Sequence, residues 1–115
     1  MNKPYYVYLL RCTDSSLYAG ITTDVVRRFA EHMSGNPKGA KYTRNHPPEE
    51  IAAVWQAENR SAASRLEWRL KHLTKVQKET LCKEPERLEE FVRTEETGLV
   101  KNVPVDTIGR EQSVC

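Results

Sequence analysis

The chain has 115 residues, 38% of them hydrophobic. This length suits one compact domain and is too short for several. The uncharged run from Pro4 to Leu10 is too short to cross a bilayer and carries no small-residue cleavage site. Three scattered cysteines without metal-ligand spacing disfavour both a disulfide framework and a structural zinc site. We therefore expect a reduced, cytoplasmic protein without a membrane span.

The net charge of +2 conceals an uneven distribution along the chain. Residues 1–82 contain 13 basic and 8 acidic side chains, whereas residues 83–115 contain 5 and 8. The densest basic stretch lies between Arg27 and Arg44. Such a cluster favours contact with a polyanion, most commonly nucleic acid, although the same charge also serves solubility alone.

The N-terminal third predicts a β-hairpin. Tyr5 to Arg11 is aromatic and β-branched at its start, Thr13 to Ser16 has turn chemistry, and Leu17 to Thr22 is a returning strand. With a three-residue loop, Tyr18 lies opposite Leu10 and Gly20 opposite Tyr8. A glycine at that position is expected to leave an open space beside the Tyr8 ring.

The next element is a predicted helix that begins after Thr22-Thr23-Asp24 and runs to about Met33. Its apolar face is expected to consist of Val25, Val26, Phe29, Ala30 and Met33. Arg28 and His32 are four residues apart and therefore lie on one side of this helix.

A basic loop, rich in Gly, Pro, Asn and Lys, follows over residues 34–48, and Ile51 to Gln56 predicts a third strand. Ser61 is expected to cap a second helix, with a buried stripe that consists of Ala62, Ala63, Leu66, Leu70 and Leu73. On a helical wheel Glu67 lies about 60° from Leu70 and about 40° from Ala63, at the border of the buried face. Trp68 lies roughly opposite the leucines, where it packs on a later segment or marks a partner surface.

Thr74 begins a further predicted helix, and residues 83–97 are acidic and partly helical from Pro85. After Gly98 no clear period is visible, and we expect this segment to be loosely held. The predicted order is β-β-α-β-α-α, which defines an α+β fold with a small three-stranded antiparallel sheet flanked by helices.

Five side chains are candidates for chemistry, although each also has an ordinary structural explanation. Strand tyrosines such as Tyr8 and Tyr18 usually pack in a core. Arg28 is typical of the solvated face of a helix. His32 lies near the C-terminal end of its helix, where a basic side chain interacts favourably with the helix dipole. Glu67 is able to pair with Lys71, Arg60 or Arg69, yet a half-buried carboxylate among apolar neighbours is the most suggestive of the five.

Several motifs occur in one order and at fixed spacing. Tyr18-Ala19-Gly20 follows Tyr6-Val7-Tyr8, with Tyr18 ten positions after Tyr8, and Arg28 and His32 come eight and twelve positions after Gly20. With these motifs, residues 4 to about 82 resemble a GIY-YIG nuclease domain. The strings LYAGITTDVVRRFAEH, KGAKYTR and SRLEWRLKHL are most similar to a small bacterial single-domain branch. The chain is also similar to the catalytic domain of the eukaryotic nuclease that cuts branched DNA.

The sequence departs from the name-giving motif at two positions. Tyr6 stands where the first glycine usually is, and Ala19 replaces the middle isoleucine, whereas both tyrosines and Gly20 remain. The asparagine that follows the last motif in some members has no match, because Asn102 lies in an unrelated context.

The resemblance implies a catalytic domain over residues 1–82 and an acidic extension over residues 83–115.

The resemblance further implies a metal-dependent DNA endonuclease. Glu67 would hold a single Mg²⁺ or Mn²⁺, with water and phosphate oxygens as the other ligands. Tyr8 would act as the general base or position the water, for which its pKa must fall from about 10. Tyr18 would orient the nucleophile, and Arg28 would bind the scissile phosphate. His32 would relay the proton or bond the phosphate.

The basic loop supplies the expected contact with the DNA backbone. Its candidate DNA-binding residues are Lys38, Lys41, Tyr42 and Arg44. No base-reading element is visible, so we expect the protein to have little preference for a particular DNA sequence. The expected substrate is branched, damaged or single-stranded DNA.

Two other functions remain open at this point. One is a DNA-binding module of the same fold without catalysis. The other is a domain that serves a protein partner through Trp68 and the acidic tail. The sequence does not determine the oligomeric state, for which we favour a monomer.

Overall fold

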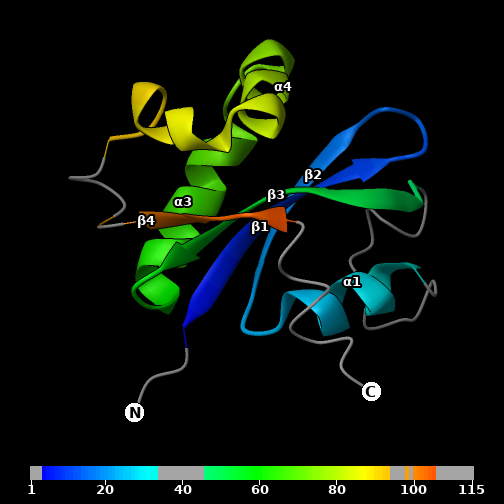
Figure 1. The fold of residues 1–115 in the computed structure, drawn as a ribbon, viewed down its shortest axis with the longest axis horizontal. Helices are drawn as coiled ribbons and strands as arrows, with labels where there is room; N and C mark the ends of the chain where they lie inside the picture. Colours follow the sequence, from blue (N-terminus) through cyan, green and yellow to red (C-terminus); the bar gives the residue numbers. More distant parts are fainter. Residues whose placement is uncertain (1–3, 34–45, 94–97, 99, 106–115) are drawn as a thin grey trace.

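The computed structural model describes residues 4–33, 46–93, 98 and 100–105 (Figure 1). Its sheet has four antiparallel strands in the order β2-β1-β3-β4. Their bounds are Tyr5–Cys12 for β1, Leu17–Thr22 for β2, Pro48–Ala57 for β3 and Val100–Val103 for β4. The α+β class is confirmed, but the sheet has one strand more than the expected three.

The hairpin of β1 and β2 has the expected register. Leu10 pairs with Tyr18, and Tyr8 pairs with Gly20. The backbone amide of Cys12 bonds to the carbonyl of Ser16 at 2.9 Å, which closes a three-residue loop. Ser15 adopts a φ of 71° in this loop, a left-handed conformation that glycine usually supplies.

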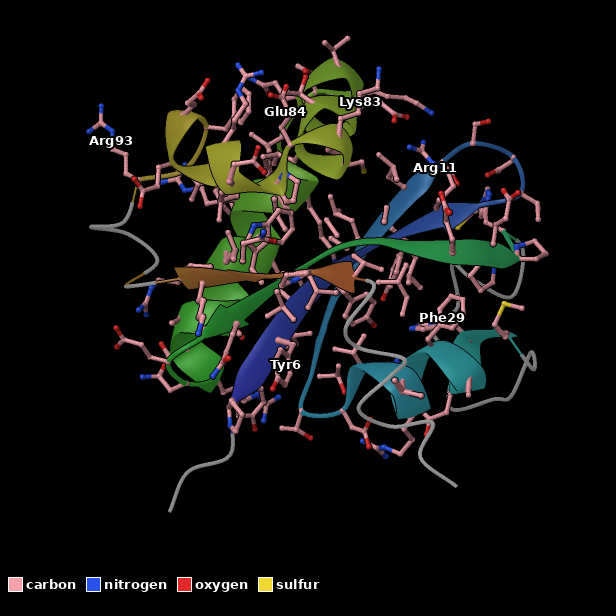
Figure 2. The ribbon with its side chains drawn as sticks, viewed as in Figure 1. Tyr6, Arg11, Phe29, Lys83, Glu84 and Arg93 are labelled. Atoms are coloured by element: carbon pink, nitrogen blue, oxygen red, sulfur yellow. The ribbon has the colours of Figure 1, made fainter. Side chains whose placement is uncertain are left out.

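The two faces of the sheet carry separate cores, because successive strand residues point to opposite sides. Helix α1, Val25–Met33, covers one face, and Figure 2 shows Phe29 between this helix and the sheet. Helices α3, Arg60–Lys71, and α4, Lys75–Lys83, cover the other face with the 3-10 helix η1, Pro85–Glu90. The fully buried side chains of the larger core include Val7, Leu9, Trp55, Leu66, Leu70 and Leu81.

The helix starts follow side-chain capping. Asp24 accepts a hydrogen bond from the Arg27 amide at 3.1 Å, as the sequence predicts for α1. Thr74 and Gln77 form a reciprocal capping box at α4, which confirms that start as well. The cap of α3 is Asn59 and not Ser61, because the Asn59 side chain accepts from the Ala62 amide.

The buried side of α1 differs from the apolar stripe that the sequence suggests. Ala30 is exposed and Met33 is 53% exposed, whereas the polar His32 is only 2% exposed. The helix is therefore rotated so that His32 faces the sheet. A polar contact for His32, described below, compensates for its burial.

The segment after residue 82 packs on the same domain. Trp55 donates its indole N–H to the Pro85 carbonyl at 3.0 Å, and Leu88 and Val92 enter the larger core. The expectation of a loosely held segment after Gly98 is wrong for β4, because its backbone pairs with the free edge of β3. A functional boundary near residue 82 stays a prediction.

An ion pair ties the far end of the hairpin to α4. Arg11 of β1 donates two hydrogen bonds of 2.5 Å to the Glu79 carboxylate, and Lys75 donates to the Ser15 carbonyl. Figure 2 shows Arg11 at this end of the sheet.

Among the described residues, no helix is long and apolar enough to cross a membrane.

Replacement of Leu70 by alanine is expected to lower the free energy of unfolding by about 2–5 kcal/mol. Its side chain is fully buried between α3 and the sheet, and the substitution leaves a cavity there. Val76→Ala on α4 is the matched control, because Val76 is 75% exposed. Urea unfolding followed by circular dichroism measures both, and equal losses would contradict this packing of α3.

Candidate active site

The site begins with a close approach between Gly20 and the ring of Tyr8. A Cβ atom at Gly20 would lie 2.4 Å from Tyr8 Oη and 2.6 Å from its Cζ, distances that no side chain tolerates. The expected open space is therefore wrong, because the Tyr8 ring itself occupies it. Gly20 is required so that Tyr8 can lie flat across β2.

The hydroxyl of Tyr8 meets the imidazole of His32. Tyr8 Oη and His32 Nε2 lie 3.0 Å apart, and both side chains are only 2% exposed. The two rings meet edge to face with centroids 6.1 Å apart. This contact satisfies two buried polar groups that come from a strand and a helix 24 residues apart.

Tyr18 and Lys71 lie beside this pair. The Tyr18 ring centroid is 5.6 Å from that of His32, and the Lys71 Nζ lies 5.8 Å from the Tyr18 ring. The second contact is a cation–π interaction between α3 and β2. The structure thus brings together the two tyrosines and His32, as the sequence predicts.

Arg28 approaches the same hydroxyl from α1. Its hydrogen bond with Tyr8 favours the ionised forms of both groups, and its Nη1 donates to Glu31 Oε1 at 2.9 Å. Burial lowers the pKa of Arg28, but the bonds with Glu31 and Tyr8 outweigh it and raise this pKa overall. Arg28 therefore stays a cation next to the cluster.

Glu67 reaches the cluster from the opposite side of the sheet. Helix α3 packs on the other face, but β2 is an edge strand, so a side chain at the border of the buried stripe can pass its edge. The Glu67 side chain is 24% exposed and lies 3.5 Å from Lys71 Nζ. Its charge raises the pKa of both Tyr18 and Tyr8, which places it near them.

The hydroxyl groups of Tyr8 and Tyr18 are protonated at neutral pH. Burial, together with the neighbouring phenol of Tyr18, raises the pKa of Tyr8 far above its usual value, and the bond with Arg28 only partly offsets this rise. Burial and the Glu67 charge likewise raise the pKa of Tyr18. Within the described residues, burial raises the pKa of Tyr8 more than Arg28 lowers it, so this pKa does not fall as a tyrosinate base requires.

His32 is neutral under the same conditions. Burial and the adjacent Arg28 cation lower its pKa to about 4, although Glu31 acts in the opposite direction. A neutral imidazole has one nitrogen free to accept a proton. In the tautomer that carries its proton on Nδ1, His32 Nε2 accepts the hydrogen bond of the Tyr8 hydroxyl at 3.0 Å.

The donor set fits a single hard divalent cation with few protein ligands. Glu67 is a partly exposed carboxylate beside the tyrosine hydroxyls, and no second acidic group is needed when water and phosphate complete the shell. Across residues 4–33, 46–93, 98 and 100–105, no group of three His, Cys, Asp or Glu side chains gathers to form a closed metal site. Such a closed site would suit zinc, whereas Mg²⁺ keeps several waters.

Some residues of the site were missed in the sequence, and others lie elsewhere. Glu31 binds Arg28, a pairing that the three-residue spacing indicates in hindsight. Asn102 lies on β4 opposite Trp55, lining a small cavity beside η1, and it does not join the tyrosine cluster. The four DNA-binding candidates lie outside the described residues; they are Lys38, Lys41, Tyr42 and Arg44.

The hairpin with its glycine contact and the cluster of tyrosines, arginine and glutamate all lie within the residues that match one family of catalytic domains. The profile of the GIY-YIG catalytic domain matches residues 4–80. The chain therefore belongs to the GIY-YIG family, whose catalytic domain indicates nuclease activity.

Relatives of similar length bear one shared name. The chain is 46% identical over 99 residues to the UPF0213 protein YhbQ of Salmonella arizonae, covering 86% of this chain and 97% of that one. It is 48% identical over 81 residues to a UPF0213 protein of Cupriavidus necator, with 70% and 86% covered. A solution NMR structure of a UPF0213 protein from Bacillus halodurans is 41% identical, with 82% and 98% covered and a TM-score of 0.46.

Acidification from pH 6.5 to about 4 is expected to destabilise the fold through His32. Between these pH values His32 binds a proton in the unfolded chain but not in the folded chain, because folding lowers the pKa of His32 from 6.5 to about 4. Stability therefore rises with pH across the window, and the share of His32 reaches about 3 kcal/mol. Melting temperatures of the wild type and His32→Gln at several pH values measure this share. Equal slopes for the two proteins would contradict a buried neutral His32.

Proposed function

We propose that this protein is a metal-dependent endonuclease that hydrolyses DNA phosphodiester bonds in the cytoplasm. The observation that carries the proposal is the 3.0 Å contact between Tyr8 Oη and His32 Nε2 beside Arg28 and Glu67. Hydrolysis needs a group that takes the proton of water and a cation that binds the phosphate. Family membership and this cluster together support the activity.

Tyr8 and His32 act as a proton relay. The attacking water passes a proton to Tyr8 Oη while the proton of Tyr8 moves to His32 Nε2, so that no free tyrosinate is needed at neutral pH. The low pKa of His32 belongs to the protein without substrate, and a phosphate anion nearby raises it. Tyr18, which lies against His32, orients the water from the other side.

Arg28 binds the scissile phosphate. Its guanidinium carries a fixed fork of donors that matches two phosphate oxygens, and its hydrogen bond to Glu31 holds the fork near Tyr8. Glu67 would hold a single Mg²⁺ or Mn²⁺ near the tyrosines. When bound, such a cation supplies charge neutralisation at the phosphate and helps the leaving oxygen.

The substrate is proposed to be DNA recognised by its structure or damage, with weak sequence preference. Lys38, Lys41, Tyr42 and Arg44 supply phosphate contacts from the basic loop, and phosphate contacts carry no sequence information. The protein is proposed to act as a monomer.

Glu67→Gln is expected to reduce cleavage of labelled DNA by at least about 100-fold in Mg²⁺ or Mn²⁺ while DNA binding persists, because the amide is a poor ligand for a hard cation. Glu49→Gln, which neutralises an exposed carboxylate on β3, is the matched control and should cut at the wild-type rate. Gel assays on single-stranded, duplex and branched DNA measure both steps. DNA binding without any wild-type cleavage would favour the non-catalytic DNA-binding module instead.

A further inference from the structure

The outward side of α3 exposes a large aromatic side chain. Trp68 is 54% exposed, although the stripe of α3 that faces the sheet already contains the fully buried Leu66 and Leu70. The indole therefore adds little to the core. An exposed tryptophan on a rigid helix indicates a contact surface.

The neighbours of Trp68 stack on its ring and place one guanidinium beside it. The His72 imidazole stacks on the indole with centroids 3.9 Å apart and an interplanar angle of 27°. His72 Nδ1 also lies 2.7 Å from the Trp68 carbonyl oxygen, which fixes the imidazole. Arg69 Cζ lies 5.2 Å from the centroid of the indole.

The charge of this helix is almost entirely of one sign. Residues 60–72 contain four basic side chains, namely Arg60, Arg65, Arg69 and Lys71. Their one carboxylate is Glu67. A single polyanion can therefore follow this face, whereas an acidic protein surface would not require the stacked aromatic.

The exposed face of α3 adjoins the proposed catalytic cluster, which consists of Tyr8, Tyr18, Arg28, His32 and Glu67. On the helical wheel Lys71 lies about 40° from Glu67 and Trp68 about 100° from it, in the same direction. Lys71 Nζ lies 5.8 Å from the Tyr18 ring, at the border between the two regions. A strand that leaves the catalytic cluster past Lys71 therefore arrives at Trp68.

We propose that an unpaired stretch of the DNA substrate binds this surface, which we name the α3 stacking face and define as Arg65, Trp68, Arg69 and His72. One base stacks on the face of the indole that His72 does not cover, and the flanking phosphates contact the arginines. This inference rests on the proposed function and narrows its substrate to DNA with a single-stranded part next to the cut. Bases in an intact duplex are already stacked on one another and do not offer a face to Trp68.

Tryptophan fluorescence gives a direct test, because Trp55 is only 1% exposed and leaves Trp68 as the accessible reporter. In a Glu67→Gln background, which prevents cleavage, oligothymidylate is expected to quench the emission. Because Trp68→Ala lacks this reporter, its affinity is measured by the fluorescence anisotropy of labelled oligothymidylate, and we expect binding about 5- to 100-fold weaker, with a much smaller effect on duplex DNA of equal length. Trp68→Phe should recover most of the affinity, and Val76→Ala on α4 should bind like its parent.

The outcomes separate this inference from the proposed function. If the wild type cuts DNA and Trp68→Ala binds oligothymidylate unchanged, the stacking face is refuted and the nuclease stands. Equal weakening for single strand and duplex also refutes stacking on an unpaired base. If the wild type neither binds nor cuts any DNA, the proposed function fails first. Melting temperatures of the Trp68 variants confirm that they are folded.

Discussion

The contact of the Gly20 backbone with the Tyr8 ring is the constraint on which the site depends. Because Gly20 has no Cβ, the ring lies across the edge strand β2, and its hydroxyl reaches His32 Nε2 at 3.0 Å. The same hydroxyl bonds to Arg28. A strand residue and two helix residues thus meet at one oxygen atom. The burial that this arrangement needs also keeps Tyr8 protonated and His32 neutral, so that a proton relay suits the site better than a tyrosinate base.

The layered fold explains how a helix from the opposite face contributes. Helix α1 carries Arg28 and His32 on one face of the sheet, whereas α3 packs on the other. Because β2 is an edge strand, Glu67 reaches the tyrosines past that edge. Lys71 lies between Glu67 and the exposed Trp68 on the surface of α3. The proposed catalytic site and the proposed single-strand site therefore occupy adjoining sides of this helix.

The sequence predicted the hairpin register and the border position of Glu67, because strand and helix periods determine which residues share a face. It did not predict β4, whose short Val100–Val103 segment forms only through pairing with β3. The burial of His32 was missed as well, since the polarity of the residue hides a contact that exists only in three dimensions. Likewise, the space beside Gly20 looked open because spacing alone does not show which neighbouring ring fills it. The roles of the individual site residues remain predictions.

Substitution of Gly20 by alanine tests the central claim most directly. The added Cβ would lie 2.4 Å from Tyr8 Oη, so the ring must move and the contact with His32 must open. We expect the sheet to remain folded and DNA cleavage to fall by about 100-fold, because the ring no longer meets His32. Displacement of the ring also reduces the burial that lowers the His32 pKa, so this pKa, measured by NMR titration, is expected to rise from about 4 toward 6.5. A His32 pKa and a cleavage rate that both stay at the wild-type values would contradict the central claim.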